Sequence, residues 1–89
     1  MHIIFYAAEG NLRKVRQMVA RGIDVNYKDY DNRTPLHLAV SNGHPDVAKY
    51  LVIHGARLNT KDIQGNDAFM IAEKKGDIEL AAWLRNFKQ

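Results

Sequence analysis

Cysteine is absent from the 89-residue chain, proline occurs only twice, and no long hydrophobic run is present. Without cysteine the chain has neither a disulfide scaffold nor thiolate metal ligands, a composition that fits a reducing compartment. The longest apolar run near the start, residues 3–8, is too short for a signal-peptide core or a membrane span. We therefore expect an intracellular, cytoplasmic protein with no membrane-spanning segment.

Motifs that carry catalysis or metal chemistry are also scarce. The chain has no glycine-rich loop that would hold a phosphate, and no two of its four histidines are spaced as on a zinc-binding helix. Residues 29–40 begin like a calcium-binding loop, but Arg33, Thr34 and Val40 stand where an oxygen ligand, the turn glycine and the closing glutamate belong. The sequence thus predicts no enzyme activity, no metal site and no cofactor.

Size and charge narrow the class further. A chain of 89 residues forms one small domain, and 46% hydrophobic with 26% charged residues is an ordinary composition for a globular protein. The formal net charge of +3 is mild and does not by itself imply an acidic partner. These values favour a single folded domain over a disordered chain.

A 33-residue periodicity is the clearest positive signal in the sequence. It is marked by two sets of glycines at this spacing, Gly10, Gly43 and Gly76, then Gly22 and Gly55. Apolar positions keep the same register, since Leu51 aligns with Leu84. The periodicity predicts three stacked units, which we name repeats 1, 2 and 3 and place at residues 1–29, 30–62 and 63–89.

Each unit is expected to contain two short helices. In repeat 2, Thr34 suits a helix N-cap, and Pro35 suits the first helical position, where its missing backbone donor is not needed. Apolar residues follow at helical spacing until Gly43 breaks the helix. Pro45 then starts a second helix, which Gly55 ends.

The segment after the second helix is predicted to be an extended hairpin loop. Residues 59–67 are polar, contain Gly65 and lack helical periodicity. Each helix pair leaves an apolar face bare, and stacking against the neighbouring units buries it.

The repeated unit resembles the ankyrin repeat. Residues 29–39 read Asp-x-x-x-x-Thr-Pro-Leu-His-x-Ala, and Gly-His and Gly-Ala-x-Leu-Asn follow in the same unit. The resemblance covers essentially the whole chain, is strongest in repeat 2, and differs there at Asn32, where the family favours glycine in the hairpin; asparagine tolerates the left-handed conformation. It implies an all-α solenoid of stacked helix-turn-helix units with β-hairpin-like loops.

The interpretation of His37 depends on this resemblance. Taken alone, a histidine near Thr34 and two aspartates is consistent with a catalytic base, a metal ligand or a structural group. In ankyrin repeats the histidine of this tetrapeptide bonds within the turn and to the backbone of the adjoining repeat, so the resemblance implies a structural role. The residues that we expect to maintain the framework are Thr34, Pro35, His37, Gly43, Gly55 and Gly76.

Ankyrin proteins contact protein partners through their hairpin tips and the exposed rims of their first helices, which implies such a surface here. The candidate residues are Tyr30, Asp31, Arg33, Ser41, Asn42, Ile63, Gln64, Asn66, Lys74 and Lys75. Tyr30 and Arg33 are the preferred anchors, because aromatic and arginine side chains dominate many interfaces. The alternative is that these are ordinary solvated loop residues, although Ile63 is an unusual choice for a solvent-exposed tip.

Three further features admit more than one interpretation. The predicted second helix of repeat 1 carries four cations, Arg13, Lys14, Arg16 and Arg21. They form either a solvated face or a contact surface for nucleic acid. Trp83 either closes the C-terminal core or anchors a partner. Residues 3–6 are consecutive apolar residues that cannot all face inward, so they favour self-association, more protein upstream, or shielding by an aromatic side chain.

The sequence predicts a non-catalytic protein-interaction module and leaves its protein partner unidentified. A second hypothesis is a regulatory or oligomerisation appendage of a larger enzyme, because residues 29–39 also resemble the C-terminal ankyrin segments of some glutaminases and asparaginases. A third, nucleic-acid binding through the basic helix, would show strong salt dependence and loss of binding on charge reversal at Arg13 and Arg16.

Overall fold

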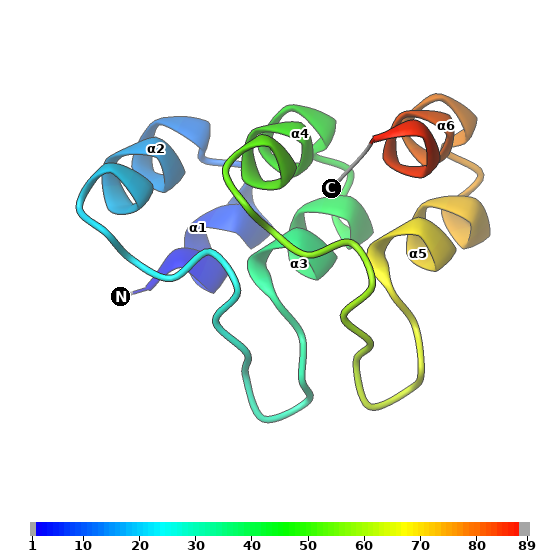
Figure 1. Cartoon of the computed structure of the whole chain (residues 1–89), viewed down its shortest axis with the longest axis horizontal. Coiled ribbons are helices and arrows are strands. Elements are labelled where there is room, and N and C mark those ends of the chain that lie inside the picture. The colour runs from blue at the N-terminus through cyan, green and yellow to red at the C-terminus, as the bar shows by residue number, and fades with distance from the viewer. Residues whose placement is uncertain (1, 88–89) are drawn as a thin grey trace.

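The computed structural model describes residues 2–87 and arranges them as three successive helix pairs (Figure 1). The helices are α1 (Ile3–Glu9), α2 (Leu12–Ala20), α3 (Pro35–Ser41), α4 (Pro45–Ile53), α5 (Ala68–Lys75) and α6 (Ile78–Asn86). In Figure 1, α1, α3 and α5 form one row, which we name the inner layer, and α2, α4 and α6 form a second, the outer layer. Residues 2–87 contain no strand and no helix with the length and apolar character needed to cross a membrane. The predicted all-α solenoid of helix-turn-helix units is confirmed.

Polar caps explain where the helices begin. Thr34 precedes Pro35 at the start of α3, and its Oγ1 accepts the His37 backbone N–H at 3.4 Å, as the sequence predicts. Helices α2, α5 and α6 start in the same way, because their N-cap side chains also accept a backbone N–H from the first turn. Each cap satisfies a donor that has no partner inside the helix, so these start points are encoded locally.

The 33-residue register is present in the backbone. Gly10, Gly43 and Gly76 each follow an inner-layer helix and have φ values of 74°, 79° and 76°. Glycine adopts this left-handed conformation at little cost, so each inner helix ends one or two residues before the equivalent glycine of its unit. The repeat boundaries predicted after residues 29 and 62 fall in the loops between helix pairs, and the boundaries themselves stay predictions.

Gly10 carries a second constraint, which its equivalents lack. A Cβ atom at Gly10 would meet the imidazole ring of His44, whereas a Cβ atom at Gly76 would have open space around it. If the His44 ring moved away, it would lose its hydrogen bond to the carbonyl oxygen of Ala8, which lies 3.1 Å from Nε2.

We therefore predict that Gly10→Ala lowers the free energy of unfolding by about 2 to 3 kcal/mol, against about 1 kcal/mol for Gly76→Ala. The additional loss of stability in Gly10→Ala reflects the collision of the new Cβ atom with the His44 ring. This additional loss should therefore largely disappear in a His44→Ala background. Urea denaturation of the four variants measures this coupling. Equal losses for the two glycine substitutions would contradict the packing described here.

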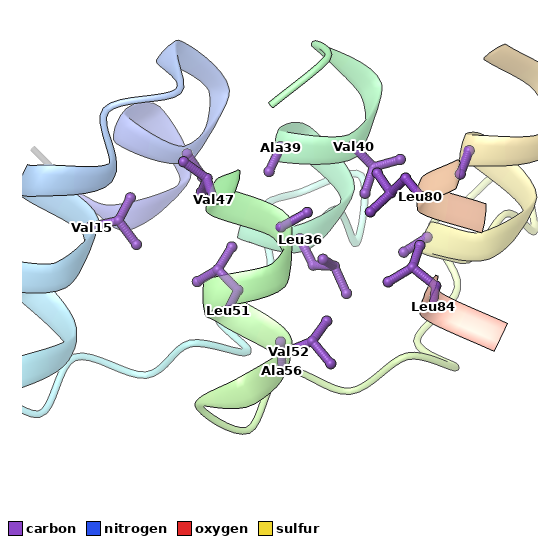
Figure 2. Close-up of a cluster of buried hydrophobic side chains, with 14 of the residues drawn as sticks. Val15, Leu36, Ala39, Val40, Val47, Leu51, Val52, Ala56, Leu80 and Leu84 are labelled. Atoms are coloured by element: carbon purple, nitrogen blue, oxygen red, sulfur yellow. The ribbon is translucent and has the colours of Figure 1, made fainter. Parts of the chain in front are cut away.

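Apolar side chains from both layers fill the space between them (Figure 2). Leu36 and Val40 of α3, Leu51 of α4, and Leu80 and Leu84 of α6 are almost completely buried. Helix α3 is central to this core because it contacts α1, α4 and α5. The core is therefore continuous through all three units, as stacking requires.

Residues 3–6 do not all face inward, as predicted. Ile3 and Ile4 are buried, whereas Phe5 remains 43% exposed and Tyr6 is half-buried. Tyr6 occupies the register position that the completely buried Ala39 holds in repeat 2. The bulky ring fits because, within residues 2–87, α1 has one neighbour in the inner layer while α3 has two.

Trp83 and the basic residues of repeat 1 lie in the outer layer. Trp83 is half-buried and packs against the core, with its ring 5.2 Å from that of Phe87, which favours the core-closing interpretation. Arg13, Lys14 and Arg16 are exposed on α2. Helix α2 ends at Ala20, so Arg21 is its C-cap and lies just outside the helix on which it was predicted.

Candidate functional site

Two loops of the same design connect the helix pairs, and we name residues 29–33 the first hairpin loop and residues 62–66 the second. In each, the backbone N–H of the first residue donates to the carbonyl oxygen of the last at 3.0 Å. The residue before the last adopts a positive φ, 58° at Asn32 and 82° at Gly65. Asparagine thus takes the place of glycine in this turn, as the sequence predicts.

Hydrogen bonds between repeats hold the two hairpin loops side by side. The backbone N–H of Ile63 donates to the carbonyl oxygen of Asp31 at 3.0 Å. Nε2 of His37 lies 2.9 Å from the carbonyl oxygen of Asn66. The loops therefore form one continuous surface together with the inner helices.

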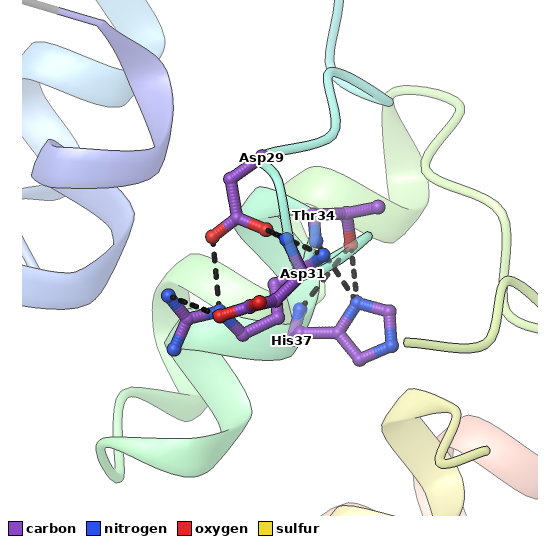
Figure 3. A network of polar contacts seen from close by, with 5 residues as sticks. Asp29, Asp31, Thr34 and His37 are labelled. Carbon is purple, nitrogen blue, oxygen red and sulfur yellow. Dashed lines mark hydrogen bonds and ion pairs between the residues drawn. The ribbon is translucent and has the colours of Figure 1, made fainter. Parts of the chain in front are cut away.

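His37 is buried, with 2% of its surface exposed, and both of its ring nitrogens are engaged. Nδ1 accepts a hydrogen bond from the backbone N–H of Thr34 at 3.0 Å and lies 2.9 Å from Thr34 Oγ1 (Figure 3). Because the Asn66 carbonyl oxygen only accepts, Nε2 carries the ring hydrogen and donates it there. Neither nitrogen is left for proton transfer or metal binding, and these are the contacts that the resemblance implies.

The Arg33 guanidinium is held by two carboxylates of its own loop (Figure 3). Nε lies 2.9 Å from Oδ2 of Asp29, and Nη2 lies 3.7 Å from Oδ2 of Asp31. The Arg33 side chain keeps 46% of its surface exposed. It is thus presented to solvent in a restricted orientation, with its charge offset by neighbouring carboxylates.

The carboxylate of Asp29 organises the first hairpin loop. It accepts hydrogen bonds from the backbone N–H groups of Asp31 and Arg33 at 2.9 and 2.8 Å. Partial burial raises the pKa of this carboxyl, but these hydrogen bonds and the Arg33 guanidinium outweigh burial and hold the pKa below its ordinary value of 3.8. The ionised form is therefore favoured in the folded state.

Asp29→Asn is expected to reduce the free energy of unfolding by about 1 to 2 kcal/mol at pH 7. Because the folded-state pKa is depressed, this contribution is complete above the unfolded value near 3.8 and is lost as the pH falls below it. The difference between wild type and variant should therefore shrink between pH 6 and pH 3 in urea denaturation. A difference that is the same at both pH values would show that the carboxylate charge has no role in the loop.

A groove of about 370 Å³ lies between α3, α5 and the second hairpin loop. Its lining combines the apolar side chains of Leu38 and Ile71 with polar and cationic groups. Six of the ten candidate residues line it, namely Arg33, Ser41, Gln64, Asn66, Lys74 and Lys75. The fold thus collects side chains from two loops and two helices into one concave surface.

Three other candidates lie at the hairpin tips. Tyr30 is fully exposed, with a relative exposure of 105%, and Ile63 is 63% exposed. Asp31 and Ile63 border a smaller hollow of about 120 Å³ beside the groove. Tyr30 instead lines a separate hollow with His2 and Tyr27, so the two preferred anchors, Tyr30 and Arg33, do not share one pocket.

Asn42 is exposed, but its side chain forms a hydrogen bond to the preceding repeat. Its Nδ2 donates to the carbonyl oxygen of Ala8 at 2.9 Å, the same oxygen that His44 Nε2 approaches. Asn26 makes a similar bridge, donating to the carbonyl oxygen of Gly55 and accepting the backbone N–H of Arg57. These contacts between repeats were not foreseen, although the Gly-His pair and the recurrence of asparagine at 33-residue spacing were visible signals.

Metal binding has no support from side-chain clustering in this part of the chain. Across residues 2–87, histidine, aspartate and glutamate side chains nowhere gather in a group of three that could hold an ion.

Comparison with known proteins is consistent with this architecture. The family model for ankyrin repeats in three copies matches residues 3–89. The chain is similar to the mitochondrial glutaminase liver isoform of Rattus norvegicus, with 33% identity over 89 residues, and to serine/threonine-protein kinase 12 of Arabidopsis thaliana, with 35% identity over 69 residues. It is also similar to protein phosphatase 1 regulatory subunit 27 of Mus musculus, with 40% identity over 57 residues.

These similarities cover 98%, 78% and 64% of this chain, respectively. They cover much less of the relatives, since the chain spans 15% of the glutaminase, 15% of the kinase and 37% of the regulatory subunit.

Proposed function

The chain belongs to the ankyrin-repeat family, whose members are generally protein-interaction modules, and on this premise we propose that it binds a protein partner through the groove between α3 and α5. In this proposal the protein is non-catalytic and acts by presenting a rigid surface. The partner contacts the groove and the adjoining hairpin tips, including Ile63 and Arg33.

The observation that carries the proposal is the convergence of six candidate residues on one groove of about 370 Å³. Its walls are held in place before any partner arrives, because His37 ties α3 to the second hairpin loop and Asp29 fixes Arg33. Preorganised side chains lose less conformational entropy on binding, which favours affinity. A rigid concave surface with mixed polar and apolar lining is suited to protein recognition.

Ser41→Trp tests this proposal by filling the groove with a bulky neutral side chain from an exposed position on α3. Gln17→Trp, the matched control, places the same side chain on the exposed face of α2. Both variants are checked for unchanged helicity and thermal midpoint, then used beside wild type for affinity purification from lysate of the cells that produce the protein. A protein retained by wild type and Gln17→Trp but lost with Ser41→Trp is the expected result. Retention by all three chains would reject the groove as the binding surface.

A second candidate function is that of an appendage within a larger enzyme. The similarity to the rat glutaminase isoform, which extends over 98% of this chain, is the observation that favours it. In that case the contacts would lie between subunits, and the exposed Phe5 at the N-terminal end is a candidate contact. Light scattering distinguishes the two functions: a monomer supports the partner proposal, and an oligomer that Phe5→Glu dissociates supports the appendage.

A further inference from the structure

The inner layer carries a row of partly exposed apolar side chains at one position of the 33-residue register. Phe5, Leu38 and Ile71 occupy equivalent positions on α1, α3 and α5. None of the three is completely buried: Phe5 is 43% exposed, and Leu38 and Ile71 are half-buried. Leu38 and Ile71 line the groove. A ligand lying across α3 and α5 therefore meets apolar surface at regular intervals.

Charge along the same layer is not uniform. The residues at one register position near the ends of the inner helices are Glu9, the last residue of α1, Asn42, the C-cap of α3, and Lys75, the last residue of α5, and all three are exposed. The preceding position is Ser41 in α3 and Lys74 in α5. At these two register positions the inner layer thus changes from acidic at α1, through neutral at α3, to basic at α5. Helix α5 also carries the exposed Glu73, which does not line the groove.

The two lysines are not explained by helix stability alone. Cations near a helix C-terminus interact favourably with the helix dipole, and both lysines lie in the last turn of α5. However, the last turns of α1 and α3 contain no basic residue, and α1 ends with Glu9. The fold therefore tolerates other residues at these positions.

The positive charge at the α5 end is available to a ligand. Nζ of Lys74 donates to Oδ1 of Asn66 at 2.8 Å, whereas the Lys75 side chain has no hydrogen bond or ion pair with any described residue. The carboxylate among the residues that line the groove, Asp62, accepts the backbone N–H groups of Gln64 and Asn66 at 3.0 and 2.9 Å. Arg33 adds a third cation, although its own loop offsets it.

We propose that the groove takes an extended acidic segment of a partner protein, an inference that rests on the proposed function and specifies the chemistry of the partner. An apolar side chain of the segment packs on Leu38 and Ile71, and its carboxylates lie toward Lys75 and Lys74. Charge complementarity of this kind sets the orientation of the segment and favours acidic over basic competitors.

Selection from a phage-displayed library of random 12-residue peptides tests the inference. Selected sequences should combine an apolar residue with several aspartates or glutamates. Fluorescein-labelled synthetic copies should bind Lys75→Glu about 10-fold more weakly than wild type, and replacing their acidic residues with asparagine and glutamine should weaken binding to a similar extent. Lys14→Glu, which makes the same change in net charge at an exposed site on α2, should leave the affinity unchanged.

The outcomes separate this inference from the proposed function. If the selected peptides are neutral or basic and Ser41→Trp abolishes their binding, the acidic segment is overturned and the groove remains the binding surface. If the selected peptides bind Ser41→Trp as well as wild type, the groove itself is rejected. Recovery of no sequence above background would also overturn the inference, because the groove would then accept no linear segment.

Discussion

His37→Ala is expected to lower the free energy of unfolding by about 3 kcal/mol, since it leaves the buried N–H of Thr34 without its partner and removes the hydrogen bond that ties α3 to the carbonyl oxygen of Asn66. The imidazole is 2% exposed, so water does not replace it. For a domain of this size the loss corresponds to a fall of about 15 °C in the thermal midpoint. Urea denaturation followed by circular dichroism measures it directly.

His54→Ala provides the matched control. His54 is exposed, and its ring makes one hydrogen bond, from the C-cap of α4 to the carbonyl oxygen of Tyr50 at 2.9 Å. We expect this variant to lose less than about 1 kcal/mol. If the two histidine variants unfold at the same urea concentration, the link that we assign to His37 does not stabilise the stack.

Leu36→Ala is expected to cost about 3 to 5 kcal/mol, the largest effect of any single substitution proposed. Leu36 is 1% exposed and belongs to α3, the helix that contacts α1, α4 and α5. A cavity there weakens packing on both sides of the central unit. Because small domains are stable by only about 5 to 15 kcal/mol, the variant should be partly unfolded at 37 °C.

Ile53→Ala is the control for this substitution. Ile53 lies in α4 of the same repeat and is 60% exposed. Its truncation removes a similar volume without opening a cavity, so the expected loss is below about 1 kcal/mol. Wild-type stability in Leu36→Ala would mean that α3 is not the packing centre of the domain.

The helices and their order were predictable because their signals are local. Thr34 and Pro35 mark the start of α3, Pro45 marks the start of α4, and Gly43 marks the turn between them. Each of these residues acts on backbone within one or two turns of itself. The 33-residue register then extends the assignment of repeat 2 to the weaker repeats on either side.

Contacts between repeats were harder to predict because they depend on how helices stack. Asn42 was a candidate for partner binding, yet its amide donates to Ala8, which lies 34 residues earlier in the sequence. The same carbonyl oxygen receives His44, a residue that sequence reasoning left without a structural role. The Gly-His pair was visible in the sequence, but it does not identify Ala8 as the partner, since that requires the relative position of neighbouring repeats.

Part of the groove lining could be predicted from the sequence, whereas the role of these residues in binding stays a prediction. Six of the ten candidate residues line the groove, because the loops and first helices recur in one register and so gather on one side of the stack. The apolar floor of Leu38 and Ile71 was missed, since both look like ordinary core positions in the sequence. The restraint of Arg33 by Asp29 and Asp31 was also missed, because side-chain pairing depends on the turn geometry.

The most direct test of the central proposal is to map binding on the surface by nuclear magnetic resonance. The ¹⁵N-labelled chain would be titrated with the partner recovered by affinity purification, and amide shift changes would be assigned by residue. We predict that the largest changes fall in residues 29–33, residues 62–66 and the C-terminal turns of α3 and α5. Changes confined to α2, α4 and α6 would contradict the proposal and place recognition on the outer layer.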